Sequence, residues 1–160
     1  MNLDKFFWDV DGVMKRLDYL VLGKDANTWE ETRNGKNVIE LVNENPEIVL
    51  QAEATEYVDR INQLYRGKTL HIITSQRPTW RPYNEKWLYL HLKCAFDIQY
   101  TNNARDKLRL LKPGEYLIDD SPLFPDFRQV ILIDKKYNRH LMVPTRVHNP
   151  DALEACLKRI

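Results

Sequence analysis

Two aspartates separated by one residue stand near the start of the chain, in the run Asp9-Val-Asp11-Gly12. They follow the short apolar segment Lys5–Trp8, so we expect Asp9 at the end of a strand. A carboxylate fixed there can attack phosphorus as a nucleophile. Asp11, two residues further on, has left the strand and can turn back as a general acid or base. Gly12 permits the tight turn that this needs.

Calcium-binding loops also use the pattern D-x-D-G, and a loop of solvated acids is a simpler interpretation. In this chain the next two residues are Val13 and Met14, both apolar. The position at which a calcium loop closes with glutamate is Leu20. The sequence therefore argues against a calcium loop.

Other polar groups follow apolar runs at the point where each run ends, namely Thr74-Ser75, Asp119-Asp120 and Asp134. In an open α/β sheet the carboxyl ends of the strands form the ligand-binding edge. Carboxylates grouped at such an edge raise one another's pKa and need a cation to coexist. A hard divalent ion with oxygen ligands, most plausibly Mg²⁺, meets that need. One of Asp119 and Asp120 can instead cap the turn at Ser121, but that use does not explain both.

Thr74 and Ser75 have two interpretations: they cap the next helix, or their hydroxyls and neighbouring amides hold a phosphate oxygen. Lys107 and Arg105 follow a further expected strand. Most such cations are solvated, yet phosphoryl transfer requires one to neutralise the phosphate oxygens. We therefore keep all four as candidate phosphate ligands.

The elements that must position these residues alternate along the chain. The expected strands are short apolar runs, at Lys5–Trp8, Leu70–Ile73, Phe96–Tyr100, Glu115–Ile118 and Gln129–Ile133. The expected helices cover residues 53–66, a segment after Pro82, and residues 151–160. This alternation predicts an α/β fold, a Rossmann-like doubly wound parallel sheet.

Residues 15–50 interrupt the alternation. Thr28-x-x-Glu31 and Asn37-x-x-Glu40 both have the form of a capping box, so we expect two short helices in a small insert over the sheet. Trp29 in this insert could stack on a base or anchor the two helices. Trp80, between two Arg-Pro pairs, could line the substrate entrance or cover the sheet edge.

The composition narrows the functional classes. A chain of 160 residues fits one domain, and 43% hydrophobic with 29% charged residues is typical of a globular one. The net charge of +1 gives no indication of a general polyanion binder, which needs a large basic excess. No apolar run approaches the roughly 20 residues of a membrane span, and no signal segment opens the chain. We expect a single cytoplasmic domain over 1–160, with Cys94 and Cys156 reduced.

Taken in order, these segments resemble the haloacid-dehalogenase-like phosphatase superfamily, and within it the 5'(3')-deoxyribonucleotidases. The similar segments are Phe7–Val13, Ile72–Ser75 with Glu85–Leu88 behind it, Asn103–Lys107, Tyr116–Ser121, Ile131–Arg139 and Arg146–Asn149. Each motif is short, but their joint order is specific. The resemblance spans residues 5–12 and 53–160.

The resemblance implies a Mg²⁺-dependent phosphomonoesterase acting through an aspartyl-phosphate on a small phosphorylated substrate such as a nucleotide monophosphate. It implies Asp9 as nucleophile and Asp11 as acid/base. The implied metal ligands are Asp9, the backbone carbonyl of Asp11, and Asp120, with Asp119 beside them, and the implied phosphate ligands are Thr74, Ser75, Arg105 and Lys107. The insert at 15–50 is smaller than the cap of those enzymes, which leaves the site more open and could admit larger substrates.

Three other functions stay open at this point. A phosphatase for phosphorylated nucleic-acid ends fits the open cap, although strand-tracking sites are usually basic. A phospho-receiver module also combines carboxylates, a hydroxyl and a lysine, but it places its acid pair first, whereas here the pair is at 119–120. A catalytically dead scaffold would have lost one of the motif residues, and none is missing.

Overall fold

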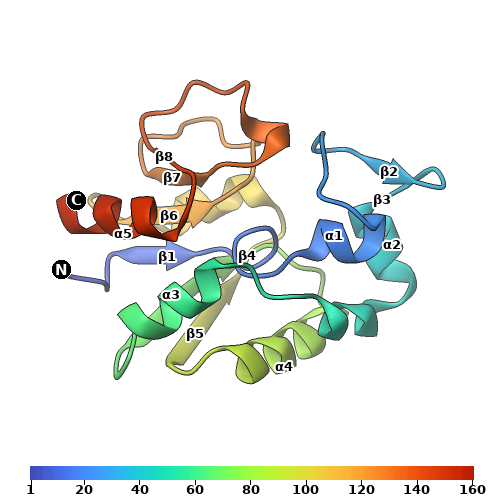
Figure 1. Ribbon diagram of the computed structural model, residues 1–160, viewed down its shortest axis with the longest axis horizontal. Coiled ribbons are helices and arrows are strands. Elements are labelled where there is room, and N and C mark those ends of the chain that lie inside the picture. The colour runs from blue at the N-terminus through green and yellow to red at the C-terminus, as the bar shows by residue number, and fades with distance from the viewer.

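A six-stranded parallel sheet forms the centre of the protein in a computed structural model that describes residues 1–160 (Figure 1). Its strands are β1 (Phe6–Trp8), β4 (Thr69–Thr74), β5 (Ala95–Tyr100), β6 (Tyr116–Asp119), β7 (Val130–Ile133) and β8 (Arg146–Val147). They lie in the order β5-β4-β1-β6-β7-β8. The chain thus builds outward from β1 in one direction and then returns to build outward from β6 in the other. This is the Rossmann order, with its switch point between β1 and β6.

The two faces of the sheet are covered differently. Helices α3 (Tyr57–Leu64), α4 (Arg81–His91) and α5 (Pro150–Arg159) pack in one apolar cluster with β1, β4, β6 and β7. The 3-10 helix η2 (Ala104–Leu110) and the loops at 122–127 and 141–143 pack against the other face. None of these helices combines the length and the apolar character that crossing a membrane requires.

The central strands are buried because their side chains are apolar on both faces. β7 is four consecutive buried residues, Val-Ile-Leu-Ile. In β1, Trp8 is fully buried, and its indole N–H donates to the Tyr65 hydroxyl at 2.9 Å. That bond satisfies the polar atom of each side chain inside the core. The short strands can therefore hold the residues that follow them in fixed positions.

The insert forms a small lobe at one end of the molecule (Figure 1). It consists of α1 (Leu17–Leu22), the hairpin β2 (Thr32–Arg33) and β3 (Lys36–Asn37), α2 (Val38–Glu44) and the 3-10 helix η1 (Pro46–Gln51). Its apolar core is Leu17, Val21, Val42 and Val49, closed by Trp80 from the main domain. The Trp80 indole N–H also donates to Asn43 Oδ1 at 2.9 Å. Trp80 is therefore the anchor of the insert, a role that neither sequence interpretation gave it.

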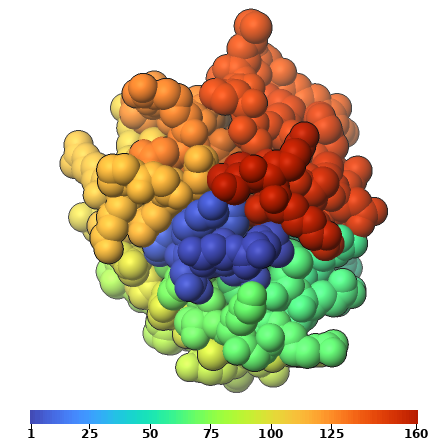
Figure 2. Space-filling view, turned by 90° about the vertical axis from the view of Figure 1, so that its left-hand side faces the viewer, coloured from blue at the N-terminus to red at the C-terminus, as the bar shows by residue number.

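Both chain ends lie at the end of the molecule opposite the insert (Figure 1). Figure 2 looks onto that end and shows the N-terminal residues flanked by the C-terminal helix and by the segment of α3. The Lys5 ammonium donates to the Ile160 carbonyl there at 2.8 Å. Both cysteines are free thiols.

The α/β prediction and all five expected strands are confirmed, and β8 is an additional short edge strand. The helix expected at 53–66 is shorter and spans Tyr57–Leu64. The capping box at Asn37 is confirmed: Asn37 Oδ1 accepts the Glu40 N–H at 2.9 Å, and Glu40 returns the bond at 2.8 Å.

The second expected capping box, at Thr28, is wrong. No helix begins there, and the first helix of the insert is α1. The chain reverses instead at Asn34 and Gly35, which have φ of 53° and 76° and join β2 to β3. Consecutive residues at positive φ make the tight turn of a hairpin. The Glu31 carboxylate pairs with Lys24 and accepts the Asn27 N–H at 2.5 Å.

Candidate active site

Three buried aspartates meet at the switch point of the sheet. Asp9 follows β1, while Asp119 ends β6 and Asp120 comes next. The two strands are hydrogen-bonded neighbours, and the Asp9 N–H donates to the Ile118 carbonyl at 2.9 Å. One carboxylate oxygen from each aspartate lies within 4.8 Å of the other two. The expected gathering of carboxylates is therefore present at the edge where α/β sheets bind ligands.

Lys107 supplies the one ammonium in direct contact with this cluster. Its Nζ lies 2.8 Å from Asp9 Oδ1 and 2.7 Å from Asp119 Oδ2. Helix η2 carries it there, and the Asn103 side chain caps η2 by accepting the Asp106 N–H at 3.0 Å. Burial alone would lower the pKa of Lys107, but the charges of Asp119 and Asp9 raise it well above its usual value. Lys107 is thus a permanent cation.

One ammonium does not neutralise three buried carboxylates. Burial raises the pKa of Asp9 to about 7, against the opposing charge of Lys107, and Asp119 adds to the rise. Burial, together with the charge of Asp119, raises the pKa of Asp120 to about 8. The neighbouring positive charges therefore do not fully offset the burial of these two carboxylates. A buried residue whose pKa is shifted this far is a candidate for function.

The three carboxylates fit a hard divalent cation. All donors are oxygen atoms, with no histidine or cysteine among them, which suits Mg²⁺ rather than a softer metal. Gly12 makes room for the Asp120 side chain, because a Cβ at Gly12 would lie 2.0 Å from Asp120 Oδ2. Gly12 also has φ of +83°, the left-handed region that favours glycine. The turn after Asp9 is therefore shaped around the Asp120 carboxylate.

Tyr137 and Asn138 also hold Asp120 in place. They lie in the 3-10 helix η3 (Lys136–Asn138), which follows β7. The Tyr137 hydroxyl donates to Asp120 Oδ2, and Asn138 Nδ2 donates to the Asp120 carbonyl at 2.9 Å and to the Ile133 carbonyl at 2.8 Å. The sequence reasoning missed both residues as site residues. The signal available was their position just after a strand that ends at the same edge.

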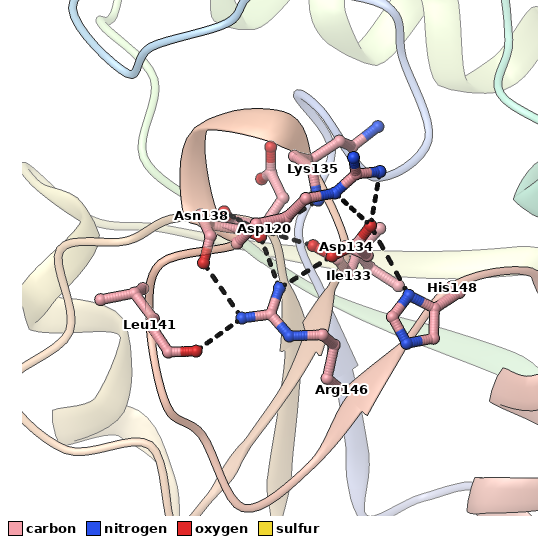
Figure 3. Close-up of polar contacts among 9 residues, drawn as sticks. Asp120, Ile133, Asp134, Lys135, Asn138, Leu141, Arg146 and His148 are labelled. Carbon is pink, nitrogen blue, oxygen red and sulfur yellow. Dashed lines mark hydrogen bonds and ion pairs between the residues drawn. The ribbon is translucent and has the colours of Figure 1, made fainter.

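Asp134 does not join the cluster, although it also follows a strand of this sheet. Its carboxylate is held by Arg139 at 2.9 Å. Arg146 holds it at 3.0 Å, and His148 Nδ1 lies 3.5 Å away (Figure 3). Burial would raise the pKa of Asp134, but the hydrogen bond and charge of Arg139 and the bond from Arg146 lower it. The expectation that all strand-end carboxylates need one shared cation is therefore wrong for Asp134, which two arginines neutralise.

Asp11 stands apart from the three clustered carboxylates. Its Oδ2 accepts a hydrogen bond from Gln76 Nε2 at 2.6 Å, and its Oδ1 lies 3.4 Å from Lys15 Nζ. Its side chain keeps 21% exposure, whereas the clustered aspartates are buried. A carboxylate beside the cluster, but reachable from outside, suits an acid/base better than a metal ligand. Lys15 and Gln76 carried no signal in the sequence.

The remaining predicted phosphate ligands differ in their position in the fold and in their exposure. Thr74 ends β4, which pairs with β1, so Thr74 and Ser75 lie at the same sheet edge as Asp9. Thr74 is buried and Ser75 half-buried. Arg105 is exposed, and its Nε donates to the Leu123 carbonyl at 3.2 Å. The structure therefore places Thr74 and Ser75 at the same sheet edge as Asp9, whereas the exposed Arg105 is held by the loop after β6.

A hollow of about 580 Å³ lies between the insert and the loops that follow β6 and β7. Its walls include Trp29 from the insert and Tyr137 and His140 from the main domain. Trp29 is 40% exposed and packs edge-on against Tyr137, with ring centroids 5.4 Å apart. Trp29 is not part of the apolar core of the insert. The interpretation of Trp29 as the anchor of the insert helices is wrong, since Trp80 fills that position in the apolar core of the insert.

Comparison of the chain with models of protein families, with curated proteins and with solved structures finds no match. Function must therefore be argued from the geometry of these residues.

Proposed function

We propose that the protein is a Mg²⁺-dependent phosphomonoesterase of the haloacid-dehalogenase-like type, with Asp9 as its nucleophile. One observation carries the proposal: Asp9, Lys107, Asp119 and Asp120 converge at the switch point, while Asp11 stands beside them with its own partners. A nucleophile, a fixed cation, a metal-binding carboxylate pair and a separate acid are the parts that this chemistry needs.

Mg²⁺ would be held by Asp9, Asp120 and the backbone carbonyl of Asp11, with Asp119 beside them. Bound there, the ion would offset the excess negative charge and shield Asp9 from the incoming phosphate dianion. The Asp119 carboxylate also makes two hydrogen bonds. Its Oδ1 accepts one from the Ser121 N–H at 2.8 Å, and its Oδ2 accepts one from the Lys107 ammonium. Asp119 therefore fixes Lys107 in front of Asp9.

The reaction proceeds in two displacements on phosphorus. An Asp9 carboxylate oxygen attacks, the bond from phosphorus to the ester oxygen breaks, and Asp11 gives its proton to the leaving alcohol. Lys107 stabilises the charge on the transferring group. In the second step Asp11, now ionised, takes a proton from water. That water attacks the aspartyl-phosphate, which releases inorganic phosphate and restores Asp9.

The hollow beside Asp120 is where we place the leaving group. Tyr137 forms one of its walls and also donates to the Asp120 carboxylate, so the hollow adjoins the reacting centre. The exposed face of Trp29 offers a surface on which a nucleobase can stack. A nucleoside monophosphate is the substrate class that this combination favours.

The end of a phosphorylated nucleic acid is the second candidate substrate. Lys136 and His140 line the same hollow, and both are exposed. The Lys136 ammonium at this rim could bind the next phosphate of a strand. The near-neutral charge of the chain argues for the mononucleotide.

A phosphate-release panel tests the proposal. It compares deoxynucleotides, ribonucleotides, sugar phosphates and end-phosphorylated oligonucleotides, each with Mg²⁺ and with excess chelator. We expect release that needs Mg²⁺ and returns when the ion is restored. Full activity in excess chelator, or no release from any phosphomonoester, would refute the proposal.

A further inference from the structure

Lys15 is a buried cation that the proposed chemistry does not use. Its side chain is 0% exposed, at the point where the chain leaves the sheet edge for the insert. Removing an ammonium from water costs free energy unless the protein offers partners in return. An apolar side chain would fill the same space without that cost. The contacts of Lys15 therefore call for an explanation.

The Lys15 ammonium joins Asp11 to helix α4. Its Nζ donates to Asn84 Oδ1 at 2.7 Å and lies 3.4 Å from Asp11 Oδ1. It also lies 5.1 Å from the centre of the Trp87 ring, a cation–π distance. Asn84 and Trp87 are themselves buried, so they hold the ammonium in a fixed position. Asp11 is the only carboxylate in direct contact with it.

The backbone holds Lys15 and Asp11 in one closed turn. The Lys15 N–H donates to the Val10 carbonyl at 3.0 Å, and the Gly12 N–H donates to the Lys15 carbonyl at 2.8 Å. On the other side of the carboxylate, Gln76 Nε2 donates to Asp11 Oδ2 at 2.6 Å. Each oxygen of Asp11 thus faces its own partner, Gln76 at Oδ2 and Lys15 at Oδ1.

We propose that Lys15 is a positioning residue that holds the Asp11 carboxylate in the place from which it transfers protons. The inference rests on the proposed function, in which Asp11 protonates the leaving group and then activates water. Gln76 holds one oxygen through a neutral bond, whereas Lys15 holds the other by its charge and ties it to α4. Without Lys15 the side chain of Asp11 keeps its chemistry but loses its fixed direction.

Two kinds of substrate separate this role from support of the fold. Nitrophenolate is a stable anion that leaves p-nitrophenyl phosphate without a proton, whereas a simple alkyl phosphate needs the acid. In Lys15→Met, rapid mixing with p-nitrophenyl phosphate should give a burst of about one nitrophenolate per site at the wild-type rate. The steady-state turnover rate should then be about tenfold or more below that of the wild type. This loss is smaller than the full factor of about 10²–10⁴ that acid–base catalysis contributes, because Asp11 itself is still present. Alkyl phosphate should show no burst and the same or a greater loss.

Arg16→Met is the matched control, since Arg16 is the neighbouring cation and makes its ion pairs with Asp25 and Glu53 rather than with Asp11. It should keep wild-type kinetics on both substrates. Lys15→Gln serves if Lys15→Met does not fold, because its amide can still donate to Asn84 Oδ1 but carries no charge to hold Asp11. We expect from it the same burst and slow turnover.

An equal fall of the burst rate and the steady rate would show that Lys15 supports the fold only, and unchanged kinetics would show that Asp11 does not depend on it. Either result overturns the inference while leaving the phosphatase proposal in place. Absence of phosphate release in the wild type would instead refute the proposed function and, with it, the role of Lys15.

Discussion

Gly12 lies so close to Asp120 that a Cβ on Gly12 would stand 2.0 Å from Asp120 Oδ2 and 2.5 Å from its Cγ. The two residues are separated by most of the chain, yet the turn after β1 is shaped around a side chain that follows β6. The carboxylate cannot retreat freely, because the Tyr137 hydroxyl already holds Oδ2. The turn at Asp9–Gly12 and the Asp119–Asp120 pair therefore depend on each other sterically as well as electrostatically.

Gly12→Ala should consequently damage the site and not only the fold. Alanine at φ +83° costs about 1–2 kcal/mol of stability, and its methyl group would displace the Asp120 carboxylate. Gly114→Ala is the matched control, since Gly114 has φ +85° and open space around it. We expect Gly114→Ala to lose only the stability that the positive φ costs and to keep phosphate release, whereas Gly12→Ala should lose more thermal stability in a melting curve and also lose phosphate release. Equal activity in the two variants would contradict the close packing of Gly12 against Asp120.

Asp9→Asn should abolish turnover and leave the fold intact. The amide is nearly isosteric, and one fewer buried carboxylate relieves repulsion within the cluster. The thermal midpoint in chelator should be unchanged or higher. Asp59→Asn, at an exposed position of α3, is the control and should keep full activity.

Beryllium trifluoride, which mimics a phosphoryl group on a carboxylate, should bind to Asp9 in the wild type. A crystal structure with the group on Asp119 or Asp120, or full activity in Asp9→Asn, would overturn the assignment of the nucleophile. It would also reopen the interpretation of the protein as a phospho-receiver.

Asp11→Asn should slow turnover by about 10²–10⁴-fold, because it removes the proton donor. Its side chain lies outside the group of three carboxylates, so the rise in melting temperature on adding Mg²⁺ should persist. Measuring both properties on one sample separates catalysis from metal binding. Loss of the Mg²⁺ effect would show that the Asp11 side chain is a ligand.

The parts of the site that could be predicted from the sequence all follow strands. Asp9, Thr74 and Asp119 end apolar runs, and parallel strands bring such ends to one edge. Lys107 could be predicted from its motif and from the need for a cation beside the phosphate. These inferences use only local pattern and the geometry of a sheet.

Contacts between distant segments could not be predicted in the same way. Lys15 looks like any solvated lysine until α4 is seen to bury it through Asn84. Asp134 looks like a further metal ligand until Arg146, from the next strand, is found beside it. The helix expected at Thr28 failed because the left-handed turn at 34–35 determines the path of that segment. In each case a tertiary contact or one turn outweighs the local signal.

Trp29→Ala should change the ranking of substrates more than the rate on a small activated ester. The ring lines the hollow and packs against Tyr137, but the core of the insert is built from other residues, so the protein should stay folded. Tyr19→Ala is the matched control: Tyr19 is also a 40% exposed aromatic residue of the insert and does not line the hollow. Activity on nucleotides and on p-nitrophenyl phosphate measures the difference. An equal loss on both substrates would show that Trp29 has no part in selecting the substrate.

Stabilisation by Mg²⁺ should grow as the pH rises. In the metal-free folded protein the pKa values of Asp9 and Asp120 are raised to about 7 and about 8. In the unfolded chain the pKa of aspartate is about 4. The folded protein therefore binds protons at these two groups more tightly than the unfolded chain does. The stability from this binding is full below about pH 4 and is lost as the pH rises through those two values. Because Mg²⁺ competes with protons for the same oxygens, it should raise the melting temperature little near pH 5.5 and by about 5 °C or more near pH 8 at saturation. Asp120→Asn should remove most of this pH-dependent gain. A Mg²⁺ effect that is constant with pH, or that is larger at low pH, would show that these carboxylates do not hold the ion.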